Sequence, residues 1–110
     1  MTQFLLLLFE DEQSYADADP SLYGEIFAEH EQFGTKHGAA LRGGNALQAA
    51  ATGRIVRGAS VTDAPFAETK EALGGYYLVE ADSIEDAVEI AKDVPHRFGY
   101  VEVRPIRTFD

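Results

Sequence analysis

The chain has 110 residues and no cysteine, which suits one domain and excludes disulfides, cysteine nucleophiles and cysteine-rich zinc sites. Its formal net charge of −10 opposes a nucleic-acid partner, because like charges repel at long range. The apolar run at residues 4–9 is far shorter than the roughly 20 residues that span a bilayer, so we expect no membrane segment and a cytoplasmic protein.

The first elements follow from this apolar run and from a helix start signal. Residues 4–9 (FLLLLF) predict a strand that is buried on both faces, and the polar residues 10–19 predict a loop. Asp19-Pro20 supplies an N-cap and a first-turn proline, and predicts a helix over about 20–37 that Gly38 ends. The apolar stripe of this helix also takes in His30. Its other members are Tyr23, Ile26, Phe27 and Phe33.

The middle of the chain predicts short strands and one polar loop. Residues 39–47 form a weaker strand that Gly43-Gly44 interrupts. Residues 49–63 predict a hairpin whose strands are residues 54–56 and 59–62, and in which Gly58 takes a positive φ at the turn. A loop rich in ionisable groups follows over residues 63–75, with a helical turn at 67–73 as an alternative.

The remaining elements have clearer boundaries. Residues 75–81 (GYYLVEA) predict a strand, since aromatic and β-branched residues favour strands. Ser83, with Asp86 three residues later, predicts the N-terminus of a helix that Pro95 ends. Residues 100–106 predict the last strand, and Pro105 places that end at a sheet edge or a bulge.

The order of these elements predicts an α+β fold in one domain over residues 1–110. It corresponds to a ferredoxin-like split βαβ unit with a hairpin insertion, in which two helices cover one face of the sheet. The other face would then be apolar and uncovered, which is unusual for a soluble monomer. We therefore expect a homodimer that packs sheet on sheet, with the hairpin or the C-terminal tail covering the face as the alternative.

Residues 61–71 (VTDAPFAETKE) and 73–77 (LGGYY) carry a family resemblance. The chain resembles the YCII-related family there, in the branch named for an Asp-Gly-Pro-Phe motif, and the likeness continues at residues 80–87 and 101–106. The motif reads Asp63-Ala64-Pro65-Phe66, so Ala64 stands where the family has glycine. If that position needs a positive φ, alanine costs about 1 kcal/mol.

The resemblance implies a dimeric α+β barrel, in agreement with the argument from the uncovered face. It also implies an active site made of a helix histidine and the motif aspartate, and these roles fall to His30 and Asp63. The family's reaction is not established. Relatives that occur beside sigma-factor systems imply a regulatory role as an alternative.

Each of the two catalytic candidates has a chemical and a structural interpretation. A histidine with a pKa near 6.5 exchanges protons near neutrality, and a carboxylate such as Asp63 would orient its ring. The structural alternative for His30 is a core histidine with one hydrogen bond, and for Asp63 a side chain that bonds its own turn.

Five further residues are candidates for ligand binding, and they lie in the polar loop and on the last strand: Phe66, Glu68, Lys70, Glu102 and Arg104. Lys70 or Arg104 would hold a small anionic ligand. The alternatives are a solvated loop, and an ion pair between Glu102 and Arg104.

Two functions from different classes remain open at this point. One is a small acid–base enzyme or ligand-binding protein that uses His30 and Asp63 and needs no cofactor. The other is a regulatory or interaction module that acts as a dimer. The three histidines lack metal-ligand spacing and Gly74-Gly75 lacks the pattern of a phosphate loop, so we expect neither a metal site nor a nucleotide cofactor.

Overall fold

The computed structural model describes residues 2–63 and 71–109. Its main feature is an antiparallel four-stranded sheet of β1 (Thr2–Glu10), β2 (Leu41–Ala46), β5 (Ala72–Ala81) and β6 (Gly99–Pro105). The strands lie in the order β2-β5-β1-β6, with every neighbouring pair antiparallel. This is the strand order of a split βαβ unit, so the predicted α+β fold is confirmed.

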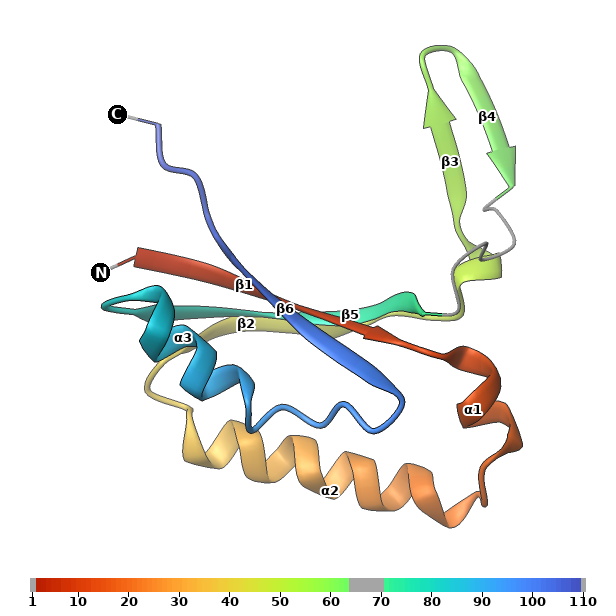
Figure 1. Cartoon of the computed structure of the whole chain (residues 1–110). Helices are drawn as coiled ribbons and strands as arrows, with labels where there is room; N and C mark the ends of the chain where they lie inside the picture. The colour runs from red at the N-terminus through yellow and green to blue at the C-terminus, as the bar shows by residue number, and fades with distance from the viewer. Residues whose placement is uncertain (1, 64–70, 110) are drawn as a thin grey trace.

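Two helices lie on one side of this sheet, α2 (Ser21–Lys36) and α3 (Ile84–Ala91), as Figure 1 shows. The core fills the space between these helices and the sheet, where Leu6 and Val79 are fully buried. Apolar side chains from the sheet, both helices and the turn after α3 make up the cluster: Phe4, Leu6, Leu8, Phe33, Val79, Ala81, Ala87, Ala91 and Val94. The alternation along β1 and β5 therefore sends every second side chain toward the helices.

The start signal of α3 works as predicted. Ser83 is the N-cap, and its side-chain oxygen accepts a hydrogen bond of 3.2 Å from the backbone N–H of Asp86. The predicted stripe of α2 is only partly correct, because Ile26 and Phe33 are buried but Phe27 is 66% exposed. The reason is local: Phe27 borders a cavity beside the sheet and does not enter the core.

The prediction of a loop over residues 10–19 is wrong. This segment contains the short helix α1 (Glu12–Asp17), which Asp11 caps by accepting a hydrogen bond of 3.2 Å from the backbone N–H of Gln13. Ser14 adds a second hydrogen bond of 2.8 Å to the other carboxylate oxygen of Asp11. The sequence does contain this N-cap signal, but a six-residue helix is too short to show a periodic apolar pattern beside it.

The predicted hairpin consists of β3 (Arg54–Arg57) and β4 (Ser60–Asp63), preceded by the 3-10 turn η1 (Ala50–Thr52). Gly58 has the positive φ that the turn requires, at 57°. The hairpin forms its own two-stranded sheet and projects on the side of the main sheet away from α2 (Figure 1). The radius of gyration is 15.4 Å, whereas a compact chain of this length has about 13 Å.

The polar loop ends earlier than predicted, because β5 begins at Ala72 and not at Gly75. The pairing of β1 with β5 shifts register between Leu8 and Phe9, opposite Gly74. The predicted helical turn at 67–73 is replaced by strand from Ala72 onward, and its earlier part lies outside the described residues. Among the helices described, none is long and apolar enough to cross a membrane.

The second face of the sheet carries the alternate residues of the same strands. Leu5, Leu7 and Phe9 of β1 point to this face, since their neighbours Leu6 and Leu8 point to the core. In the described parts of the chain, no helix packs on this face (Figure 1). We call it the open face.

Candidate functional site

His30 lies on the side of α2 that faces the sheet, because it follows Ile26 by four residues and precedes Phe33 by three. Its ring is half-buried, and Nδ1 lies 2.6 Å from the hydroxyl oxygen of Tyr77. The two ring centroids are 5.9 Å apart. The helix and the central strand β5 thus fix the imidazole from two sides.

A cavity of about 310 Å³ opens beside His30. It lies at the end of the sheet where β1, β2 and β5 meet α2, and it is mainly apolar. Its walls are formed by Leu8, Glu10, Phe27, His30, Gly44, Asn45, Ala46, Gly74, Gly75, Tyr76 and Tyr77. The volume is at the small end of the range of about 300–1,000 Å³ that ligand pockets occupy. We call this space the His30 cavity.

Gly44 positions the aromatic wall of the His30 cavity. A Cβ atom at this residue would lie 2.8 Å from Cδ1 of Tyr77 and 2.8 Å from the backbone oxygen of Tyr76. Glycine at this position therefore leaves room for the Tyr77 ring where it contacts His30. The predicted interruption at Gly43-Gly44 is wrong in its place, because both glycines pair with β5 and the register shift lies between Leu41 and Gly43.

Burial sets the protonation of the two hydrogen-bonded groups. It lowers the pKa of His30, because the imidazolium loses water, while the carboxylates of Glu10 and Glu29 partly oppose this effect. Burial also raises the pKa of Tyr77. At pH 7 the pair therefore consists of a neutral imidazole and a neutral phenol, and one proton is shared between Nδ1 and the hydroxyl oxygen.

Such a pair can accept or donate a proton at the other ring nitrogen, Nε2. When the hydroxyl of Tyr77 donates to Nδ1, Nε2 carries the ring proton and acts as a donor; in the other tautomer it acts as an acceptor. A change of tautomer needs Nε2 to give up or take a proton while Nδ1 takes or gives one, and the Tyr77 hydroxyl, 2.6 Å from Nδ1, can donate to or accept from Nδ1 in either tautomer. This is the chemistry that general acid–base catalysis uses.

Glu10 brings a carboxylate to the wall of the His30 cavity from the end of β1. The hydroxyl of Tyr15 donates a hydrogen bond to it, and Tyr15 lies in place because α1 begins directly after the strand. Burial and the bond to Glu10 raise the pKa of Tyr15, so this group stays a neutral donor. The sequence signal for Glu10 was its place two residues after Leu8, on the core-facing side of the strand.

The predicted partner of His30 lies elsewhere. Asp63 ends β4 in the projecting hairpin, is exposed, and lies 3.4 Å from Nε of Arg54, its cross-strand neighbour. It neither borders the His30 cavity nor bonds to His30 within the chain. The carboxylate that the described residues place at this cavity is Glu10, which the sequence reasoning missed.

The other predicted site residues do not meet at the cavity. Glu102 and Arg104 form an ion pair on β6, opposite Leu7 and Leu5 of β1, and therefore on the open face. This placement fits the structural interpretation, in which Glu102 and Arg104 form an ion pair with each other. Three candidates lie outside the described residues: Phe66, Glu68 and Lys70.

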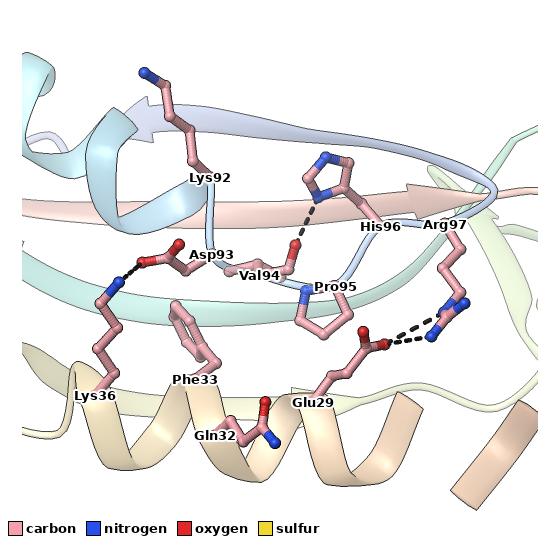
Figure 2. Close-up of a pocket in the computed structure, with 10 residues that line it drawn as sticks. All are labelled: Glu29, Gln32, Phe33, Lys36, Lys92, Asp93, Val94, Pro95, His96 and Arg97. Atoms are coloured by element: carbon pink, nitrogen blue, oxygen red, sulfur yellow. Dashed lines mark hydrogen bonds and ion pairs between the residues drawn. The ribbon is translucent and has the colours of Figure 1, made fainter. Parts of the chain in front are cut away.

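A second, wider groove of about 600 Å³ runs between α2 and the segment that connects α3 to β6. Figure 2 shows that charged residues bridge the groove near both ends. Nζ of Lys36 lies 2.9 Å from the carboxylate of Asp93, and Arg97 donates to Glu29 at 3.0 Å. Hydrogen bonds from His37 and Lys36 lower the pKa of Asp93. These oppositely charged side chains pair across the groove. The two pairs hold the segment between α3 and β6 against α2.

No group of three or more histidine and acidic side chains in the described parts of the chain could hold a metal ion.

The sequence of the chain is also similar to those of known proteins. The model of the YCII-related domain matches residues 4–110. One similar curated protein is "Uncharacterized protein R00369" from Rhizobium meliloti (strain 1021), with 42% identity over 65 residues. The match covers 56% of this chain and 52% of that protein, so the chain spans about half the length of the curated relative it matches.

Proposed function

We propose that the chain, which belongs to the YCII-related domain family over residues 4–110 as its resemblance at residues 61–71 and 73–77 predicted, is a small-molecule-binding protein with acid–base chemistry at the His30 cavity. The hydrogen bond between His30 Nδ1 and the Tyr77 hydroxyl, in the wall of a cavity of about 310 Å³, carries this proposal. In the proposed role His30 takes up or delivers a proton through Nε2, and the Tyr77 hydroxyl holds the ring by a hydrogen bond that it donates to Nδ1 or accepts from it. No cofactor takes part.

Filling the cavity should weaken ligand binding, and Gly74 is a suitable position for a larger side chain. Gly74 borders the cavity, and a Cβ atom there would meet only the backbone oxygen of Leu8, at 3.9 Å. We expect Gly74→Val to fold and to weaken small aromatic ligands at least tenfold. Ligands would be found by thermal shift on the wild type, and their affinities measured by NMR titration.

Gly43→Val is the matched control, since Gly43 also lies in a strand, a Cβ atom added there would meet nothing within 4 Å, and the residue does not border the cavity. It should bind the same ligands as the wild type. His30→Gln should bind them more weakly than the wild type, because it loses the imidazole. Ligands that bind Gly74→Val as tightly as the wild type would show that the cavity is not the binding site.

A second function rests on a different observation, the surface that the chain exposes. Its accessible area is 7593 Å², whereas a compact folded chain of 12.0 kDa exposes about 6,000 Å². The excess of about 1,600 Å² is twice the roughly 800 Å² that each partner buries in a standard interface. A second copy of the chain on the open face would remove about half of this excess in an interface of standard size.

The charges of the open face favour a second copy as the occupant. Two chains of net charge −10 repel each other over most of their surfaces. On the open face, however, Glu102 is paired with Arg104, and Glu80 is paired with Arg42 at 3.2 Å. The face is thus apolar and locally neutral, and each ion pair can exchange partners across a two-fold axis.

The alternative role, a regulatory or interaction module, would act through this dimer. We expect a mass of twice 12.0 kDa in sedimentation or light-scattering measurements. Leu7→Glu should shift the protein to the monomer, since it places a charge in the middle of the open face. Val88→Glu, on the exposed side of α3, should leave the dimer intact. A monomeric wild type at tens of micromolar would contradict the dimer.

A further inference from the structure

The charge of the His30 cavity selects among classes of ligand. Glu10 is the one carboxylate in the described cavity wall, and burial disfavours the charged forms of His30 and Tyr77. Neither lysine nor arginine is part of that wall. The single carboxylate belongs to a chain with a net charge of −10, which adds to the negative potential.

The hydrogen-bonding groups of the cavity agree with this electrostatic picture. Glu10 accepts one hydrogen bond from Tyr15, and an ionised carboxylate has room to accept others. The apolar part of the wall includes Leu8, Phe27 and the ring of Tyr77. A protonated amine can donate to the carboxylate while its apolar body lies against the aromatic rings, which also attract cations.

We propose that the His30 cavity takes a small primary amine with an apolar or aromatic body and discriminates against carboxylates and phosphates. Glu10 receives the ammonium group, and His30 lies within the same cavity as the group that exchanges protons with the ligand. The inference rests on the proposed binding role of the cavity. It differs from the anionic ligand that Lys70 or Arg104 predicted, since Arg104 lies on the open face and Lys70 lies outside the described residues.

Three compounds of nearly equal shape test the ligand class at pH 7.5 and 150 mM salt: benzylamine, benzyl alcohol and benzoate. Each is titrated into ¹⁵N-labelled protein, and the amide signals of Ala46, Gly74 and Gly75 report binding at the cavity. We expect benzylamine to bind at least fivefold more tightly than benzyl alcohol, and benzoate to bind most weakly.

Glu10→Gln should remove the preference for the amine, so that benzylamine and benzyl alcohol bind equally. The glutamine keeps the shape of Glu10 and an oxygen that can accept from Tyr15. Glu31→Gln is the matched control, because it removes the same charge from the exposed side of α2, away from the cavity wall, and should keep the preference. The comparison of the three compounds on the wild type decides the ligand class even if Glu10→Gln fails to fold.

The outcomes separate this inference from the proposed function. If benzoate binds most tightly, or if the folded Glu10→Gln keeps the preference for benzylamine, the ligand class is wrong and the binding role of the cavity stands. If none of the three compounds shifts the cavity amides at millimolar concentration, both the ligand class and the binding role are contradicted.

Discussion

Replacing Phe33 by alanine is expected to lower the free energy of unfolding by about 3–4 kcal/mol, the largest effect of any single side chain on α2. Phe33 is 2% exposed and belongs to the core cluster. Its ring packs against Tyr77 with centroids 4.7 Å apart and against His37 at 5.2 Å. Truncation therefore leaves a cavity in the core and removes support from the hydroxyl partner of His30.

Phe27→Ala is the matched control for this prediction. Phe27 lies on the same helix and loses the same atoms, but its side chain is 66% exposed, so the cost should be below about 1 kcal/mol. Chemical denaturation of the two variants and the wild type measures the difference. Equal losses for Phe33→Ala and Phe27→Ala would show that α2 does not pack on the sheet as described. If Phe33→Ala does not fold, Phe33→Leu should fold with a loss of about 1.5 kcal/mol.

Gly99→Ala should cost about 3 kcal/mol, because the added methyl group meets backbone on the neighbouring strand. A Cβ atom at Gly99 would lie 2.8 Å from the carbonyl carbon of Phe9 and 2.9 Å from Cα of Glu10. Real side chains do not reach such distances, and backbone cannot rotate away as a flexible side chain can. The start of β6 must then separate from β1, where Gly99 pairs with Glu10.

The effect of Gly99→Ala should reach the His30 cavity, since Gly99 pairs with Glu10 at the end of β1. Amide exchange should rise at Asp11, whose N–H donates to the carbonyl of Phe98 at 3.0 Å. Gly43→Ala, where no atom lies within 4 Å of the added carbon, should change neither stability nor exchange by a comparable amount. A stable Gly99→Ala protein with unchanged exchange at Asp11 would contradict the described pairing of β1 with β6.

The elements of the fold were predictable where a local signal decides the structure. The run at residues 4–9 is apolar on both alternating faces and forms the central strand β1. Asp19-Pro20 begins α2 within one residue, Ser83 caps α3, and Gly58 turns the hairpin. Each of these predictions depends on a signal within a few neighbouring residues of the sequence. α1 was missed although Asp11 caps it, because a six-residue helix offers too few turns for a periodic pattern.

The site was predictable only in part, because its partners come from the pairing of distant strands. His30 could be found from its position on the helix stripe. Its contact with Tyr77 depends on the place of β5 beneath α2, and Tyr76 is an equally aromatic neighbour in the sequence. Glu10 reaches the same cavity through the register of β1 with β5. Asp63, chosen from the motif, instead pairs with Arg54 across a local hairpin.

The central position of β1 also governs how the chain acquires its structure. The strand pairs with β5, which begins at Ala72, and with β6, which begins at Gly99, so both of its edges stay open until distant segments arrive. An unpaired FLLLLF segment has the composition that promotes intermolecular strand addition. Glu10, Asp11 and Glu12 follow it directly and repel another copy of the same segment. The acidic residues that later supply the cavity carboxylate and the cap of α1 thus protect the nascent strand from self-association before its neighbours exist.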